Sequence, residues 1–459
     1  MDILLTHGYS LAEDAHERAV MKPYPTLGLL YISAYLKSKG YGVGVFDTTF
    51  QTLADFEGHL QRERPPVVGI YVNLMTKFNV LKMMAMCQAV GATVILGGPE
   101  PANYAEEYLA RGADVIVVGE GELTMEDLLT RCLTSLPDVP GIVFRNDDGQ
   151  ILHTPTRPYI PTLDSLPFPD RAAIDMRRYV DTWRTHHGAG SVSLICARGC
   201  PFHCQWCSHA VYGHSHRRRS PGNVADELEM LLAEYKPDQV WYADDVLTIH
   251  RKWFLEYAAL LKRRNLKAPF ECISRPDCLN DDVIAALAGM GCYRLWLGSE
   301  SGSQRVLDAM QRGTNVEDLQ AKAKQLKNVG ISVGMFIMLG YEGEEIADLD
   351  ATTEHLKKSA PDIFLTTVAY PIKGTGYHTT VQDRVLAPSG WEHISDRDLS
   401  VQGRRSRRFY SFATRWMVNS VALHREWHGA RHPMRLAKTL ANTAVGRAGM
   451  MMTQKERET

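Results

Sequence analysis

The feature that most constrains the fold of this chain is an alternation of short apolar runs with helix-like segments, which occurs in two separate parts of the sequence. In the first part, apolar runs of strand length occupy residues 2–7, 42–49, 67–76, 93–98 and 113–122. Segments with helical periodicity, such as residues 26–40, lie between them. Strands joined by helical crossovers form parallel sheets. We therefore predict an α/β domain with a doubly wound parallel sheet over residues 1–132.

The same alternation returns after residue 190. Further apolar runs begin near Val192, Gln239, Phe270, Tyr293, Ser332 and Ile363. Helical segments such as 224–235 and 281–291 separate them. Six strand–helix units are fewer than the eight of a complete TIM barrel. We predict a partial (β/α)6 TIM-type barrel over residues 191–388.

The remaining segments have a different composition. Residues 133–190 are rich in proline, and residues 141–154 have the pattern of a hairpin closed by an Asp-Gly turn, so we predict a linker with a small ribbon. Residues 389–459 are predicted to form a small helical region without strands. Residues 401–459 contain 12 Lys/Arg and 3 Asp/Glu. This basic surface could meet an acidic carrier, an anionic lipid or a phosphorylated substrate, but we favour a role in keeping the helix soluble.

Composition, the first residues and the length of the apolar runs indicate the compartment in which the protein resides. The chain is 45% hydrophobic and 23% charged, with a net charge of −2, which gives no general case for nucleic-acid binding. Its first residues, MDILLTHGYS, lack a signal-peptide pattern, and no apolar run approaches the roughly 20 residues of a membrane span. We predict a cytoplasmic protein without a transmembrane segment, in which clustered cysteines bind metal or perform redox chemistry.

Three cysteines, Cys200, Cys204 and Cys207, lie within eight residues directly after the first predicted barrel strand. Active sites of barrel enzymes are built at that end of the strands. Three thiolates on one loop can hold a [4Fe–4S] cluster, which normally takes four cysteines, and then leave one iron open. A zinc site that includes Cys196 is the alternative. We disfavour zinc because Cys196 lies within an apolar run, where cysteine packs as a core residue.

The spacing C-x3-C-x2-C, with Trp206 before the last cysteine, resembles the signature of the radical S-adenosylmethionine (SAM) superfamily. Residues 242–248, 272–279, 295–314 and 334–345 resemble barrel strands of the subgroup that carries an N-terminal cobalamin-binding domain. PYPTLGLLYISAYLKSKGYGVGVFD, LGGPEP and VVGEGE resemble that Rossmann-like domain. The chain thus resembles the cobalamin (B12)-binding-domain-containing radical SAM enzyme family from residue 1 to about 385.

This resemblance implies three cofactors: a [4Fe–4S] cluster, SAM and cobalamin. The cluster ligands would be Cys200, Cys204 and Cys207, with no catalytic residue beyond them. Candidate SAM contacts lie on the cysteine loop or at the ends of barrel strands: Trp206, Asp244, Ser274, Arg275 and Glu300. The resemblance implies that Glu300 touches SAM. Arg275 could clamp a carboxylate of SAM or of an acidic substrate, or form a structural ion pair.

Candidate cobalamin contacts follow the predicted strands of the first domain, where parallel sheets bind ligands. They are His7, Asp47, Asn73, Leu74, Gly97, Gly98, Glu120 and Gly121. The motif D-x-H-x-x-G, whose histidine ligates cobalt in many such domains, is absent. We therefore expect no histidine on cobalt. A domain that has lost cobalamin and serves as a scaffold is the alternative. The basic run 214–220 is expected to be a solvated loop that could neutralise anionic groups near the cofactors.

The resemblance implies methylation of an unactivated carbon, in which a 5′-deoxyadenosyl radical takes a hydrogen and methylcobalamin delivers the methyl group. A cyclase or carbon-skeleton rearrangement enzyme with the same cofactors is the alternative. A non-catalytic cobalamin sensor is a further one, but it would not need an open iron. The expected partners are a small-molecule substrate and an external electron donor such as flavodoxin or ferredoxin.

Overall fold

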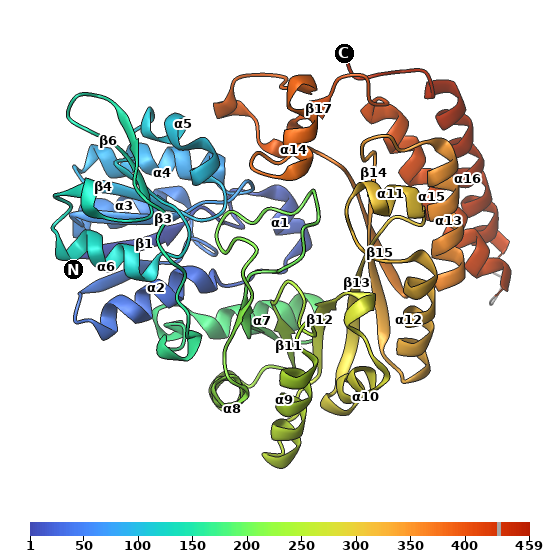
Figure 1. Cartoon of the computed structure of the whole chain (residues 1–459), viewed down its shortest axis with the longest axis horizontal. Helices are drawn as coiled ribbons and strands as arrows, with labels where there is room; N and C mark the ends of the chain where they lie inside the picture. The colour runs from blue at the N-terminus through green and yellow to red at the C-terminus, as the bar shows by residue number, and fades with distance from the viewer. Residues whose placement is uncertain (429–432) are drawn as a thin grey trace. The chain divides into compact units, whose positions relative to one another are not determined.

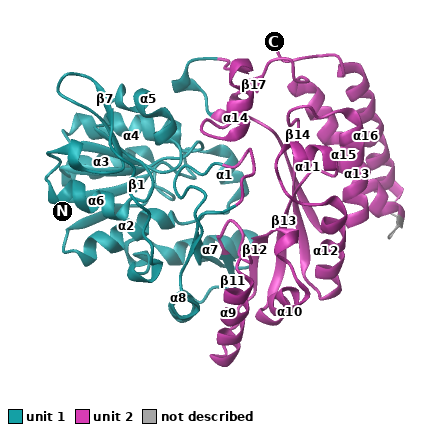
Figure 2. Cartoon of the chain, viewed as in Figure 1, with its two compact units in different colours: residues 1–201, 208–241, 389–395 teal, residues 202–207, 242–388, 396–459 magenta. Residues whose placement is uncertain are grey.

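The computed structural model describes residues 1–428 and 433–459, and it divides into two compact units (Figure 2). Unit 1 comprises residues 1–201, 208–241 and 389–395, and unit 2 comprises residues 202–207, 242–388 and 396–459. The cysteine loop contributes to both units, because Cys200 belongs to unit 1 whereas Cys204 and Cys207 belong to unit 2. Of the predicted C-terminal region 389–459, residues 429–432 lie outside the described residues.

The first sheet has the strand order β2-β1-β3-β4-β5-β6-β7. Its first five strands are parallel, as predicted. They are β1 (Ile3–His7), β2 (Val43–Phe46), β3 (Val67–Tyr71), β4 (Thr93–Gly97) and β5 (Val115–Val117). The register pairs Thr6 of β1 with Phe46 of β2 and Ile70 of β3. The carboxyl ends of these strands therefore share one edge of the sheet.

Helices cover both faces of this sheet (Figure 1). They are α2 (Leu27–Ser38), α3 (Leu53–Glu63), α4 (Lys77–Ala89), α5 (Ala105–Leu109) and α6 (Glu122–Thr130). Side chains alternate along β1, so that Leu4 packs in an apolar cluster with α3, α4 and α5, whereas Ile3 and Leu5 pack with α2 and α6. Burial on both faces explains why the strands are continuous apolar runs.

The predicted hairpin is present, but it is not a separate ribbon. Its strands are β6 (Ile142–Arg145) and β7 (Ile151–His153), and β6 pairs antiparallel with β5. The hairpin therefore extends the first sheet. The sequence shows the turn but not this pairing, although Ile142 and Phe144 bury their side chains in the same cluster as Ile3.

The second sheet has the order β15-β14-β13-β12-β11-β8, so each strand lies beside the preceding one in the sequence. Its strands are β8 (Ser191–Leu194), β11 (Gln239–Tyr242), β12 (Phe270–Ser274), β13 (Cys292–Glu300), β14 (Ser332–Leu339) and β15 (Ile363–Val368). Helices between them are α8 (Pro221–Tyr235), α9 (Arg251–Arg263), α10 (Asp281–Met290), α11 (Gln304–Ala309), α12 (Val316–Asn328) and α13 (Ile346–Ser359). All six predicted strands are confirmed, and the order is that of a partial barrel.

The chain ends in a helical region. Its long helices are α15 (Arg407–His428) and α16 (Pro433–Thr453), which follow the short helix α14 (Gly376–Val381). The prediction that no strand occurs beyond residue 389 was wrong, because β17 (Ser400–Val401) pairs antiparallel with β16 (Val385–Leu386). A two-residue strand formed by a distant partner leaves no periodic signal in the sequence. Within the described residues, no helix is long and apolar enough to cross a membrane.

The other elements are short. They are α1 (Ala15–Val20), α7 (Met176–His187), β9 (Ala197–Arg198) and β10 (Arg217–Arg218). Single 3-10 turns connect several of the larger elements.

Candidate functional site

The loop 202–207 is held by the barrel elements of unit 2. The backbone N–H of Gln205 donates to the carbonyl of Met310 at 3.1 Å, and the N–H of Tyr377 donates to the carbonyl of Gln205 at 2.7 Å. Trp206 packs against the apolar cluster that contains Met310 and Tyr377. Gly376 leaves room for the side-chain amide of Gln205, since a Cβ there would lie 2.1 Å from its Oε1. The backbone that carries Cys204 and Cys207 is therefore fixed.

Two buried guanidinium groups converge on Cys204. Nη1 of Arg312 donates to Sγ of Cys204 at 3.6 Å, and Nη1 of Arg275 donates to the same sulfur at 3.7 Å. The Arg275 guanidinium also lies 3.6 Å from the ring centre of Phe202. Its Nη2 donates to the carbonyl of Arg312 at 2.9 Å, and its Nε donates to Asp277. Arg275 therefore forms a structural ion pair with Asp277, which was one of the alternatives from the sequence, and it also contacts Cys204.

These neighbours change the protonation of the thiols. A hydrogen bond with Cys207 and the guanidinium groups of Arg312 and Arg275 outweigh burial and lower the pKa of Cys204 to about 5. The same hydrogen bond, together with burial, raises the pKa of Cys207. The two guanidinium groups therefore favour the ionised form of Cys204, and the thiolate is the form that binds iron.

Glu300 ends β13, as predicted, and adopts a left-handed backbone conformation with φ of +61°. Its Oε1 lies 3.9 Å from Nε of Arg312. Burial raises the pKa of Glu300 to about 7, although Arg312 opposes this rise. Gly298 makes room for the arginine, since a Cβ there would lie 2.4 Å from Nη2 of Arg312. A non-glycine residue in this conformation is uncommon and often marks a functional position.

The other candidate SAM contacts lie near the ends of their strands. Asp244 is buried, and it lies two residues after the end of β11 at Tyr242 rather than at the strand's last position. The hydroxyl of Ser274, the last residue of β12, lies 2.6 Å from the hydroxyl of Thr248. Their contact with SAM stays a prediction.

The residues of the loop suit an iron–sulfur cluster chemically. Cys204 lies beside two guanidinium groups, which would balance the negative charge of a thiolate-ligated cluster. Cys196 is fully buried, as expected of a core residue, and Cys200 is half-buried. Within residues 1–428 and 433–459, no group of three or more His, Cys, Asp or Glu side chains is arranged to hold a metal ion. The set Cys200, Cys204 and Cys207 therefore stays a prediction.

At the carboxyl edge of the first sheet, His7 belongs to a buried polar network. Its Nδ1 accepts from the backbone N–H of Tyr9 at 3.2 Å, which places the ring proton on Nε2, 3.0 Å from Oδ1 of Asp47. The hydroxyl of Tyr179 donates to Asp47. Burial raises the pKa of Asp47, but hydrogen bonds from His7 and Thr49 outweigh it and hold the pKa below its ordinary value. Both nitrogens of His7 are engaged.

The other cobalamin candidates lie at the same edge. Oδ1 of Asn73 accepts from the backbone N–H groups of Met75 and Thr76 and so shapes the loop that contains Leu74. Gly98 has φ of +112°, and a Cβ there would lie 2.4 Å from the carbonyl oxygen of Val72. A Cβ on Gly121 would lie 2.5 Å from Ile32, whereas one on Gly97 would meet Val117 only at 3.8 Å.

Glu120 is held by two arginines. Arg198 donates to its Oε1 at 2.7 Å, Arg217 donates to both oxygens at 2.9 and 2.8 Å, and the N–H of Ile160 donates at 2.8 Å. A contact of Glu120 with cobalamin stays a prediction, and this pairing disfavours it. The expectation that residues 214–220 form a solvated loop was wrong. Arg219 is buried and pairs with the buried Glu227, because a buried carboxylate requires a cation.

Two protein families match separate parts of the sequence. The B12 binding domain family matches residues 19–129, and the Radical SAM superfamily matches residues 194–356. The chain belongs to the radical SAM enzymes that carry a B12-binding domain. Both matched ranges fall inside the predicted domains 1–132 and 191–388, whose boundaries stay predictions.

Three curated relatives illustrate the chemistry of the family. An uncharacterized methyltransferase of Pyrococcus horikoshii is 26% identical over 84% of this chain and 85% of its own length. The anaerobic magnesium-protoporphyrin IX monomethyl ester cyclase of Rubrivivax gelatinosus is 28% identical over 74% of this chain and 63% of its own length. The cytidylyl-2-hydroxyethylphosphonate methyltransferase of Streptomyces wedmorensis is 26% identical over 77% of this chain and 76% of its own length.

Two solved structures share the fold of this radical SAM enzyme. The radical S-adenosylmethionine methyltransferase TsrM from Kitasatospora setae, with cobalamin and a [4Fe-4S] cluster bound, has a TM-score of 0.68 at 18% identity and covers 84% of this chain and 76% of its own. The cobalamin-dependent S-adenosylmethionine radical enzyme OxsB, with aqua-cobalamin bound, has a TM-score of 0.74 at 15% identity and covers 98% and 72%.

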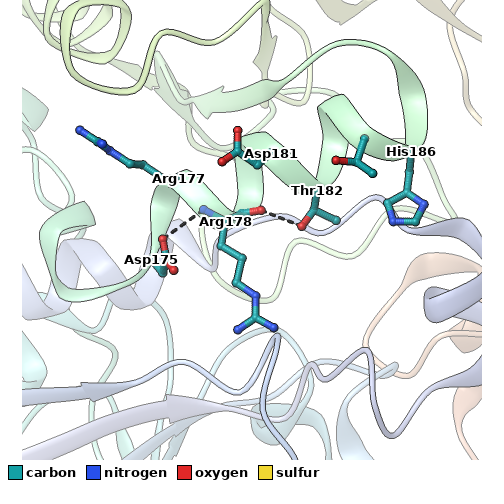
Figure 3. Close-up of a pocket in the computed structure, with 7 residues that line it drawn as sticks. Asp175, Arg177, Arg178, Asp181, Thr182 and His186 are labelled. Atoms are coloured by element: carbon teal, nitrogen blue, oxygen red, sulfur yellow. Dashed lines mark hydrogen bonds between the residues drawn. The ribbon is translucent and has the colours of Figure 1, made fainter.

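Sequence reasoning missed Arg312. The only available signal was its position inside the segment 295–314, which carried the family resemblance. A hollow of about 380 Å³ beside α7 contains none of the predicted site residues (Figure 3). Its lining includes Asp175, which caps α7 by accepting from the backbone N–H of Arg178. Its residues are those of a helix surface, and no cysteine lines it.

Proposed function

We propose that this radical SAM enzyme is a cobalamin-dependent methyltransferase that acts on an unactivated carbon of a small-molecule substrate. The observation that carries the proposal is the convergence of Arg275 and Arg312 on the Cys204 thiolate, with Glu300 beside them. A radical SAM site needs iron-binding thiolates and partners for the charged amino acid portion of SAM, and these residues have both chemistries. Methyltransferases recur among the relatives.

In this proposal the chain's own residues have distinct roles. Cys200, Cys204 and Cys207 hold the [4Fe–4S] cluster, which supplies the electron for reductive cleavage of SAM when bound. The guanidinium of Arg312 pairs with the carboxylate of SAM, and the carboxylate of Glu300 accepts a hydrogen bond from the amino group of SAM. Each charged group of SAM thus meets an opposite charge, because a buried charge without a partner is unfavourable. Arg275 assists at the carboxylate. Trp206 keeps the cysteine loop packed against the barrel.

Cobalamin would lie at the carboxyl edge of the first sheet, where Gly97 leaves the backbone open to a close approach. His7 donates to Asp47 and accepts from Tyr9, so neither ring nitrogen is available to cobalt. We therefore propose a cobalt without a histidine ligand. An external electron donor such as flavodoxin or ferredoxin would reduce the cluster.

A second candidate function is cyclisation with the same cofactors. The observation that favours it is the 28% identity to the magnesium-protoporphyrin ester cyclase of Rubrivivax gelatinosus over 74% of this chain. A cyclase forms the substrate radical but transfers no methyl group.

One experiment separates the two candidates. The reconstituted protein is incubated with cobalamin, reductant, substrate and methyl-labelled SAM, and S-adenosylhomocysteine and 5′-deoxyadenosine are both counted. A methyltransferase of this type consumes one SAM for methyl donation and one for radical formation, so the two products should appear in about equal amounts. 5′-Deoxyadenosine alone, without label in the product, supports cyclisation. Methylation that survives Cys204→Ala would contradict the radical mechanism, and Cys196→Ala serves as the matched control.

A further inference from the structure

Helix α16 exposes an apolar face that nothing in the described structure covers. Met434 and Met452 are 86% and 78% exposed at the two ends of the helix, and Leu440, Val445 and Met451 are also exposed. The exposed positions between them include four alanines: Ala437, Ala441, Ala444 and Ala448. A helix surface of this length without an acidic residue is unusual for a solvated face.

The opposite side of α16 packs against α15, beside which it runs in Figure 1. A Cβ on Gly446 would lie 2.6 Å from the backbone nitrogen of Trp416, and one on Gly449 would lie 2.3 Å from the ring of Phe412. The two helices therefore approach each other closely along the side of α16 that carries Gly446 and Gly449. This packing leaves the side with Met434 and Met452 facing outward.

The same pair of helices is strongly basic. Helix α15 contains four arginines and one glutamate, and α16 contains three basic residues and no acidic one. The glutamate, Glu426, pairs with Arg435 at 2.8 Å. Lys438 lies exposed within the apolar face, and Arg415 at its flank bonds only a neutral group in the described residues, the amide of Asn442. Arg447 pairs with Asp350 and Arg408 pairs with Glu456, both outside the two helices, whereas Lys438 and Arg415 have no carboxylate partner among the described residues. The surface thus combines apolar side chains with two basic residues whose charge is not balanced.

We propose that the α15–α16 surface docks onto an anionic phospholipid bilayer, with the apolar face of α16 in the interfacial region. An apolar helix face bordered by Lys and Arg is the composition that binds membrane surfaces without spanning them. Each basic residue near an anionic surface adds to the attraction. This inference is independent of the chemistry proposed for the cysteine site.

A second copy of the chain fits this face less well. A strip about 31 Å long, from 21 residues, and about 10 Å wide has an area of roughly 300 Å². A stable interface buries about 800 Å² per partner. A two-fold interface would also place the same basic surface on both subunits, and like charges would repel each other. An anionic bilayer removes both difficulties.

The test is co-sedimentation of the full-length, anaerobically reconstituted protein with vesicles. Vesicles of about 70% phosphatidylcholine and 30% phosphatidylglycerol should bind the protein, and pure phosphatidylcholine vesicles should bind at least tenfold less. The double variant Met434→Gln/Met452→Gln should weaken binding at least tenfold, because both apolar side chains leave water on docking. Lys438→Glu should weaken it about fivefold or more.

Matched controls are available elsewhere on the surface. Val329→Gln alters another exposed apolar residue, and Lys252→Glu makes the same charge change on α9. Neither control should affect binding. The proposal is overturned by an absence of vesicle binding, by equal binding to neutral vesicles, or by variants that bind as the parent does. It is also overturned if sedimentation equilibrium shows a dimer that Met434→Gln/Met452→Gln dissociates, since a second copy would then be the occupant.

Discussion

Nη1 of Arg312 lies 3.6 Å from Sγ of Cys204, although 108 residues separate them in the sequence. Arg275 approaches the same sulfur from the end of β12. A thiolate that accepts from two guanidinium groups is stabilised in its ionised form. The two arginines therefore place positive charge beside the cysteine loop, and the first two predictions concern these residues.

Replacement of Arg312 should weaken SAM binding. Arg312→Gln removes a charge-assisted contact, so the dissociation constant for SAM should rise about 10- to 100-fold, and Arg312→Lys should recover only part of the loss. Equilibrium binding to the reconstituted protein measures this. Iron content must stay unchanged for the result to count. Unaltered SAM affinity in Arg312→Gln would show that the arginine is purely structural.

The cysteines should differ in their effect on iron. Alanine at Cys200, Cys204 or Cys207 should reduce bound iron and sulfide to a small fraction of the parent's content, because each thiolate is a proposed ligand. Cys196→Ala should keep the cluster, since its side chain is buried in the core. Iron and sulfide analysis after anaerobic reconstitution provides the measurement. A cluster that needs Cys196 but not one of the other three would refute this ligand set.

His7 should not ligate cobalt. In the His7→Ala protein with bound cobalamin, the electron paramagnetic resonance spectrum of Co(II) should match that of the parent protein. The variant should be less stable, because Asp47 and the N–H of Tyr9 each lose a hydrogen-bond partner at a cost of about 1–3 kcal/mol. Nitrogen hyperfine structure that disappears in the variant would contradict the prediction.

Lys77 anchors the segment 389–395 within unit 1. Its side chain is 1% exposed, and its Nζ donates to the carbonyls of Trp391 at 2.6 Å and Ile394 at 2.7 Å and lies 3.7 Å from the Trp391 ring centre. Lys77→Met should lower the free energy of unfolding by about 3 kcal/mol, because buried acceptors lose their donor.

Urea denaturation of the apoprotein measures this loss. Lys37→Met is the control, since Lys37 forms a half-exposed pair with Asp170 that should contribute about 1 kcal/mol or less. If the two variants lose the same free energy of unfolding, the buried contacts of Lys77 stabilise the protein no more than a half-exposed ion pair does.

Glu344 should make stability depend on pH. Burial raises the pKa of Glu344 to about 8 in the folded protein. Between about pH 4.5 and pH 8 the folded state keeps a proton on Glu344 that the unfolded chain releases. The stability contributed by the protonated Glu344 is therefore complete below about pH 4.5 and is lost as pH rises towards 8. The loss is on the order of 4 kcal/mol.

Glu344→Gln mimics the protonated form and keeps an acceptor for the N–H of Gly340, which now donates to Glu344 at 2.6 Å. Its urea midpoint should exceed that of the parent at pH 8 and approach it at pH 5. Asp383→Asn alters a carboxylate on an exposed turn and is the control. Parallel pH profiles for parent and Glu344→Gln would show that the group titrates normally.

The sequence by itself determined the order of elements, the six barrel strands and the position of the cysteine loop. These features are local: strand and helix periods appear within a few residues, and the cysteine spacing is visible directly. Because strand patterns are local, the sequence also indicated that Glu300 ends a strand and that Cys196 lies in the core.

The tertiary structure decided which distant side chains meet. It paired β6 with β5, brought Arg312 to Cys204, paired Arg217 with Glu120, and joined Lys77 to Trp391 across 314 residues. Such contacts depend on sheet register and on the need of each buried charge for a partner, and neither leaves a periodic pattern in the chain. The buried arginines looked like solvated charge in the sequence because their carboxylate partners lie elsewhere along it.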